Sequence, residues 1–218
     1  MRVLFVSQEM PPETGWGGIG TYVDVLSEAL AAKGHEVHVL SVAEDQPPSR
    51  TQRGGVTIHR FPLPPAGDPT GRLPETWMRL RQAVSVMRMF RRLDLRPDVV
   101  EAPEWMAEGL ALGWSAKLPL VVRLHSSARQ LFAFSGQGVR LRGFDGRWAA
   151  GLEELSARRA NLVVSTRSNL AEVSGALRLD GEALRAIPIP IRLPAPRPMN
   201  GASPGSSTTK LPKPCAAQ

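Results

Sequence analysis

Residues 2–42 read RVLFVSQEMPPETGWGGIGTYVDVLSEALAAKGHEVHVLSV, and this stretch decides the fold class. Residues 2–7 form an apolar run typical of a strand. Residues 8–16 must then be loop, because their two prolines lack amide donors and fix φ. From residue 19 apolar side chains recur at spacings of three and four until a glycine stops the pattern, which predicts a helix with one buried face. Residues 37–42 form a second apolar run, so the stretch predicts a β–α–β unit.

A cluster of glycines opens the predicted helix: Gly15, Gly17, Gly18 and Gly20. A helix that begins on glycines presents its first N–H groups and the positive end of its dipole without obstruction by side chains. When such a helix starts above the end of a strand, it favours an anion, most often a phosphate. The sequence therefore predicts a phosphate-facing loop between residues 8 and 20.

Strands and helices continue to alternate further along the chain. The pattern predicts strands over residues 56–61, 98–102, 120–125 and 162–165, and helices over residues 74–93, 104–117 and 147–160. Repeated alternation implies right-handed crossovers, and hence an α/β fold with a Rossmann-like parallel sheet covered by helices on both faces. Ligands collect at the carboxyl ends of such strands, so the loops after Ser7, Ala102, His125 and Ser165 should share one rim.

Length and composition divide the chain into a domain and a tail. With 218 residues, of which 42% are hydrophobic, the chain can bury a sizeable core in one domain, which we expect to span residues 1–193. Eight of the 20 prolines fall between Pro188 and Gln218. Residues 194–218 are rich in proline, glycine and serine and cannot bury enough apolar surface to offset their ordering entropy. We therefore expect a disordered tail there.

Several classes of protein are disfavoured by what the sequence lacks. No apolar run approaches the roughly 20 residues of a membrane span, and the N-terminus has no signal-peptide pattern, so the expected location is the cytoplasm. The one cysteine, Cys215, allows neither a disulfide framework nor a cysteine-based metal site within one chain. The net charge of +7 comes from 23 arginines and 4 lysines without aromatic residues interleaved among them, which argues against nucleic acid as a partner.

The glycine cluster leaves a dinucleotide-binding alternative open. Gly15, Gly17 and Gly20 satisfy the spacing G-x-G-x-x-G, and Glu44 after the second strand could bind a ribose. In that motif, however, the first glycine closes the turn directly after the strand, whereas here about seven residues of loop follow Ser7. An NAD(P)-dependent oxidoreductase therefore remains an alternative. A phosphate-binding NTPase loop is excluded, because its lysine and hydroxyl residue are absent.

Taken together, a series of ordered motifs resembles the family-4 glycosyltransferases of the GT-B fold. Its opening consists of SQE at 7–9, PP at 11–12, GGIGTY at 17–22 and GHEV at 34–37. It continues with DVVEAPEW at 98–105, VRLH at 122–125, LVVS at 162–165 and IPIPI at 187–191. The last segment is similar to the family's strand before the crossover between domains, where asparagine is usual in place of Ile189. The resemblance covers about residues 1–193.

The resemblance implies a transferase with two facing Rossmann-like domains. Such an enzyme moves a sugar from a nucleotide-sugar donor to a saccharide or lipid-linked acceptor, with retention at the anomeric carbon. The chain is similar to the N-terminal, acceptor-side domain, and no residues remain after Leu193 for the donor domain, so we expect it to be inactive alone. The alternative is a non-catalytic module that binds an acceptor or docks onto a partner protein carrying the donor domain.

The resemblance also implies roles for five residues. Gly17 and Gly18 would place backbone N–H groups against the donor diphosphate, where charge develops as the leaving group departs. His125 would contact the sugar as the catalytic histidine, and Glu9 and Glu104 would bind acceptor hydroxyls. No metal or cofactor is expected, since the nucleotide sugar enters as a substrate.

The predicted helix over residues 74–93 carries a basic stripe of Arg81, Arg88 and Arg92 next to an apolar arc. A basic amphipathic helix can hold a protein against anionic lipid, which would place the chain peripherally at the inner face of the membrane. A solvated face on a helix packed against the core explains the same pattern, and this is the interpretation that we favour.

Overall fold

The computed structural model describes residues 1–15, 17–44, 46–64, 71–114, 118–130, 143–170 and 183–190. The strands are β1 (Arg2–Val6), β2 (Glu36–Ala43), β3 (Ser49–Arg53), β4 (Val56–Pro62), β5 (Val99–Pro103), β6 (Leu120–Arg123), β7 (Leu162–Ser165) and β8 (Leu184–Ala186). The helices are α1 (Gly18–Ala32), α2 (Pro74–Leu93), the 3₁₀ turn η1 (Trp105–Ala107), α3 (Leu110–Gly113) and α5 (Phe144–Arg158). No helix within these ranges is both long and apolar enough to cross a membrane.

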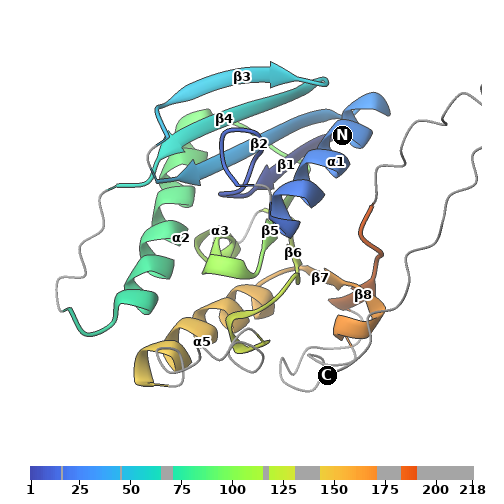
Figure 1. The fold of residues 1–218 in the computed structure, drawn as a ribbon. Coiled ribbons are helices and arrows are strands. Elements are labelled where there is room, and N and C mark those ends of the chain that lie inside the picture. Colours follow the sequence, from blue (N-terminus) through green and yellow to red (C-terminus); the bar gives the residue numbers. More distant parts are fainter. Residues whose placement is uncertain are drawn as a thin grey trace, which may run out of the picture.

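The strands form one sheet in the order β3-β4-β2-β1-β5-β6-β7-β8 (Figure 1). All neighbours pair in parallel except β3, which is antiparallel to β4 at the edge. The predicted α/β fold is therefore confirmed. From β1 the chain passes through α1 to β2, which lies on one side of β1 in the sheet. From β5 it passes through α3 to β6, which lies farther toward the opposite edge. The order of the strands thus reverses between β1 and β5, and this switch point is where parallel sheets place ligands.

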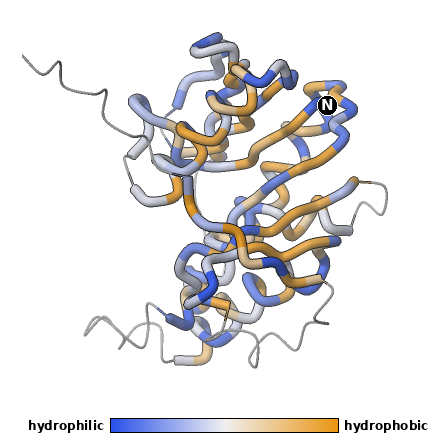
Figure 2. Tube along the Cα trace, turned by 90° about the vertical axis from the view of Figure 1, so that its right-hand side faces the viewer, coloured by the Kyte–Doolittle hydropathy of each residue, from blue (hydrophilic) through white to orange (hydrophobic). Residues whose placement is uncertain are grey.

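Alternation along the central strands builds two cores, one on each face of the sheet. Val3 and Phe5 pack with Tyr22 and Val23 of α1 on one face. Leu4 and Val6 belong to the larger cluster on the other face, which α2 and α5 cover. Figure 2 shows the apolar strand segments running through the middle of the molecule, with hydrophilic segments toward its outside. Because β1 is buried on both faces, its rigid carboxyl end fixes the loop that follows it.

The edge strand β3 was not predicted from the sequence. Its residues, SRTQR, lack the apolar alternation that marks a half-buried strand, because both of its faces are largely exposed. The pairing with β4 is instead set by the two-residue turn Gly54–Gly55. Both glycines have positive φ, as hairpin turns of this length require.

Two predicted elements were wrong. The expected helix over 104–117 is replaced by η1 and the short α3, because Met106 and Ala107 adopt φ of 60° and 51° and break the helix. The expected strand at residues 187–191 is displaced, since β8 ends at Ala186. Ile187 N–H still donates to Ser165 O at 2.8 Å, but Pro188 and Pro190 have no N–H to continue the ladder. Ile191 and the tail expected over 194–218 lie outside the described residues.

Candidate functional site

A pocket of about 370 Å³ opens at the switch point of the sheet, where the carboxyl ends of β1, β5 and β6 meet the N-terminus of α1. Its lining consists of Glu9, Gly18, Ile19, Trp105, His125, Ser126 and Ile189. The volume is within the range of small-molecule sites. Three of the five residues singled out from the sequence, Glu9, Gly18 and His125, therefore line one pocket.

The β1–α1 loop forms one wall of this pocket, and Glu9 organises it. The Glu9 carboxylate accepts a hydrogen bond from Gly20 N–H at 2.9 Å and so caps α1. A Cβ on Gly17 would overlap the same carboxylate, at 2.8 Å from its carbon, whereas a Cβ on Gly18 would meet nothing within 4 Å. Among the described residues, the N–H groups of Gly18 and Ile19 have no hydrogen-bond acceptor. The helix thus leaves two amides open beside the pocket.

His125 forms the opposite wall, at the end of β6. Its ring lies edge-on to the ring of Tyr22, with 5.1 Å between the ring centroids. Burial, reinforced by the nearby Arg123 guanidinium, lowers the pKa of His125 to about 4. The imidazole is therefore neutral near pH 7, with one ring nitrogen able to donate a hydrogen bond and the other able to accept one.

A buried network that the sequence analysis did not identify packs against the His125 ring through Tyr22. The Tyr22 hydroxyl donates to Glu101, and the Arg123 guanidinium lies 4.5 Å above the Tyr22 ring and 3.5 Å from Glu101. Burial and the Glu101 carboxylate raise the pKa of Tyr22. Glu101 and Arg123 interrupt two apolar runs, VVEAP and VVRLH, at neighbouring strands. A charge of each sign inside adjacent apolar strands was the signal that could have revealed this pair.

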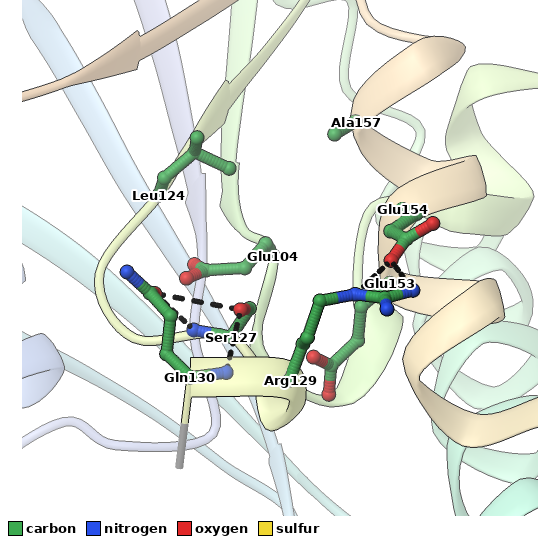
Figure 3. A pocket seen from close by; sticks show the side chains of 8 residues that line it. All are labelled: Glu104, Leu124, Ser127, Arg129, Gln130, Glu153, Glu154 and Ala157. Carbon is green, nitrogen blue, oxygen red and sulfur yellow. Dashed lines mark hydrogen bonds and ion pairs between the residues drawn. The ribbon is translucent and has the colours of Figure 1, made fainter. Parts of the chain in front are cut away.

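Glu104, like Gly17, does not line the pocket. Its side chain is 1% exposed, and its Oε1 accepts a hydrogen bond from the backbone N–H of His125 at 2.7 Å. It faces a separate cavity of about 30 Å³ that Ser127 and Glu153 also line (Figure 3). Within the described part of the chain, no cluster of three histidine, cysteine or acidic residues is placed to hold a metal ion.

Comparisons with known proteins agree with this geometry. Residues 17–190 match the glycosyl transferase 4-like domain. The chain belongs to this family. Glycogen synthase from Mycobacterium tuberculosis is 31% identical over 141 residues, which are 58% of this chain and 34% of that protein. D-inositol 3-phosphate glycosyltransferase from an Arthrobacter species is 31% identical over 138 residues, 59% of this chain and 32% of that protein. The chain therefore spans about a third of the curated relatives that it matches.

Solved structures share the fold. Sucrose-phosphate synthase from Thermosynechococcus elongatus superposes with a TM-score of 0.62 at 18% identity, over 86% of this chain and 47% of that one. Medicago truncatula UGT71G1, solved with UDP-glucose, superposes with a TM-score of 0.53 at 14% identity, over 86% and 51% of the two chains. The family-4 chain described here thus has the α/β fold of one half of a GT-B glycosyltransferase.

Proposed function

We propose that this family-4 chain is the N-terminal, acceptor-side domain of a glycosyltransferase that moves a sugar from a nucleotide-sugar donor to a saccharide or lipid-linked acceptor. One observation carries the proposal: Gly18 and Ile19, whose amides have no acceptor among the described residues, line the same pocket as the neutral His125. Family membership supports it, as do the curated relatives, which are named as a glycogen synthase and a D-inositol 3-phosphate glycosyltransferase. The UDP-glucose in the Medicago structure supports a nucleotide sugar as the donor.

In this proposal the start of α1 stabilises the leaving diphosphate. The amides of Gly18 and Ile19, together with the positive end of the helix dipole, meet negative charge as it develops on the phosphate oxygens. Gly17 and Gly18 serve different purposes. Gly17 leaves room for the Glu9 carboxylate, and Gly18 leaves room for the ligand, because no part of the described chain occupies the space beside it.

The opposite wall holds the reacting sugar. A neutral imidazole at His125 donates to one hydroxyl or accepts from another without adding a charge to the site. Glu9, which uses Oε2 to cap Gly20, lines the pocket and can accept a hydrogen bond from an acceptor hydroxyl. Glu9 also places a negative charge beside the proposed phosphate position. We therefore expect this chain alone to bind nucleotide sugars in the millimolar range or weaker.

The test is sugar transfer by the 218-residue chain with and without a donor domain, supplied in trans or fused after Ile191. Transfer should appear only when both domains are present, because the effective molarity of donor and acceptor is lost when either domain is missing. His125→Ala should then lower turnover by about 100-fold. Gly18→Ala should reduce transfer strongly, since its methyl group enters the space of the diphosphate.

Gly151→Ala is the matched control for Gly18→Ala. Both glycines lie in helices, and a Cβ on either meets nothing within 4 Å, but Gly151 lies on α5 away from the site pocket. Equal effects of the two substitutions would refute the diphosphate position. Robust transfer by the 218-residue chain without a donor domain would refute a site divided between two domains. Acceptor binding without transfer in the reconstituted protein would favour the non-catalytic docking module.

Peripheral contact with anionic lipid stays a prediction for α2. Of its basic stripe, Arg81 is already engaged, because it binds Glu44 at 2.7 Å and Pro64 O at 2.6 Å. Arg88 is exposed. If α2 binds phosphatidylglycerol vesicles, Arg88→Ala should weaken cosedimentation by about fivefold, the effect of roughly 1 kcal/mol per charge near the surface. Lys33→Ala, at the exposed C-cap of α1, is the control. No binding by the unchanged chain would favour the solvated face.

A further inference from the structure

We propose that the turn after β5 is a clamp made of two uncharged carboxyl groups, in which Glu104 positions the His125 loop and Glu108 positions the loop that carries Glu9. Both act through other residues, so they are positioning residues of the site and not catalytic ones. The consequence for sugar transfer rests on the proposed function, whereas the clamp itself can be tested on the chain alone.

The hydrogen bonds of the two carboxyl groups define the clamp. Glu104 Oε1 accepts from His125 N–H at 2.7 Å, at the end of β6. Glu108 Oε1 accepts from Gln8 N–H at 3.1 Å, one residue before Glu9 and just after β1. The two glutamates are four residues apart in one turn. A single short segment therefore holds the backbone of both walls of the pocket.

The backbone of this turn is itself held in an unusual conformation. Met106 and Ala107 both have positive φ, which is uncommon for residues with side chains and persists only where the surroundings enforce it. Glu153 on α5 supplies part of that enforcement, because its Oε1 accepts Met106 N–H at 3.3 Å. The left-handed pair sits between Glu104 and Glu108 and lets their side chains reach different loops. A continuous helix would have placed them one turn apart on one face.

Each carboxyl group has one oxygen without a partner. Glu104 and Glu108 are 1% and 0% exposed, and Oε2 of each has no hydrogen-bond partner among the described residues. The side chain of Gln82, which contacts Glu108 through its amide nitrogen at 3.5 Å, likewise has an unpaired buried Oε1. A proton on Glu108 would supply the donor that this group of acceptors lacks. The cavity of about 30 Å³ beside Glu104 has room for one water molecule, which would accept a hydrogen bond from a protonated Oε2.

Electrostatics favours the uncharged form of both groups. Burial raises the pKa of Glu104 and of Glu108 to about 8, against the amide hydrogen bonds that lower it. Glu153 adds like charge near Glu104, and Glu9 does so near Glu108. The cations in this region are engaged elsewhere: Arg79 with Glu153 and Glu75, and Arg129 with Glu154. His125, whose backbone N–H binds Glu104, adds no charge there, because its imidazole is neutral near pH 7.

Backbone NMR on the 218-residue chain tests the clamp, because an amide proton that is bonded to a carboxyl group changes its chemical shift when that group ionises. The His125 and Gln8 amides should both titrate with a midpoint within about one unit of pH 8. Glu104→Gln should abolish only the His125 titration, and Glu108→Gln only that of Gln8. In both variants the fold should persist, since glutamine matches an uncharged carboxyl group in shape. Glu154→Gln should change neither titration, because the partners of this carboxylate among the described residues are Arg129 and Arg158.

Three outcomes would overturn the clamp: midpoints near pH 4.5, titrations that survive the matching glutamine substitution, or unfolding of both glutamine variants. Failure of the proposed function is recognised separately. If both amides titrate but the reconstituted two-domain protein transfers no sugar, the clamp stands and the glycosyltransferase proposal fails. If sugar is transferred but neither amide titrates near pH 8, the clamp fails alone.

Discussion

The two walls of the pocket are built in opposite ways. The wall formed by residues 7–20 is partly exposed and offers backbone N–H groups, whose accessibility depends on glycines in its own sequence. The wall at His125 depends on the turn over residues 104–108, which is buried and acts through side chains bonded to distant loops. Local sequence therefore determines which amides the first wall offers. Tertiary packing determines the second wall and, through the hydrogen bond from Gln8 N–H to Glu108, also anchors the start of the first. Single substitutions should therefore lower the free energy of unfolding more at the buried wall than at the exposed one.

The largest expected effect comes from removing the ion pair beneath the buried turn. Arg79 is 1% exposed and binds Glu153, which in turn accepts the N–H groups of Met106 and Ala128. Arg79→Ala leaves a buried carboxylate without its counter-ion and should lower the free energy of unfolding by about 3–5 kcal/mol. Urea unfolding monitored by circular dichroism measures the change.

Arg92→Ala serves as the control for that substitution. Arg92 lies on the same helix but is exposed, so its loss should change the free energy of unfolding by less than about 0.5 kcal/mol. Replacing both Arg79 and Glu153 by methionine should cost less than Arg79→Ala, because no charge is then left uncompensated. An Arg79→Ala effect as small as that of Arg92→Ala would show that packing, and not the ion pair, holds the turn.

The pH dependence of stability should separate His125 from the glutamates that position the walls. The folded-state pKa of His125, about 4, lies below its ordinary 6.5, so between these values the unfolded chain binds a proton that the folded chain does not. The contribution of His125 to the free energy of unfolding should therefore rise by at most about 3 kcal/mol as the pH increases from 4 to 6.5. Glu104 and Glu108 act with the opposite sign, because their pKa values are raised from 4.5 to about 8. Their contribution is present below pH 4.5 and is lost as the pH rises toward 8.

Urea unfolding at a series of pH values tests both expected directions of the change in the free energy of unfolding. His125→Gln should remove the rise that His125 contributes between pH 4 and 6.5, and it should keep the rise from His59, whose pKa burial also lowers to about 4, and the opposite contributions of the two glutamates. Glu104→Gln should be more stable than the unchanged chain at pH 8 and no more stable than it at pH 4.5. If His125→Gln kept the full rise, the ring would already be protonated in the folded chain at pH 6, and its neutral role in the site would be lost.

Much of the exposed wall could be predicted from the sequence, because glycine and proline report on the backbone at their own positions. The helix that begins within the glycine cluster and the parallel order that brings the strand ends to one edge are confirmed, whereas the phosphate at that loop stays a prediction. Gly18, Glu9 and His125 meet in one pocket, although their roles stay predictions. The sequence could not show that Glu9 caps Gly20, because that contact spans a loop of eleven positions.

The buried wall could not be predicted for a physical reason. An apolar stretch with good helix formers, such as residues 104–117, favours a helix in isolation. Here three hydrogen bonds outweigh that preference: the N–H groups of His125 and Gln8 donate to the glutamates of this turn, and its own Met106 N–H donates to Glu153. Glu104 was expected to bind an acceptor hydroxyl, whereas its side chain is 1% exposed, which is rare for a glutamate. Its burial depends on strands far away in the sequence, and no local pattern encodes it.

The smallest expected effect concerns the exposed wall and distinguishes its two glycines. Gly17→Ala places a methyl group against the Glu9 carboxylate and should force that side chain away from Gly20 N–H, which costs about 1 kcal/mol of stability, as the loss of a helix cap does. Gly18→Ala should change the free energy of unfolding by less than about 0.5 kcal/mol, because its methyl group enters open space. In a Glu9→Ala background the Gly17 substitution should become nearly neutral, and urea unfolding of the single and double variants measures this coupling. If Gly17→Ala cost as much without Glu9 as with it, the loop backbone itself would require glycine there. The two glycines would then differ by backbone conformation, and the division between a glycine that accommodates Glu9 and a glycine that accommodates the ligand would not hold.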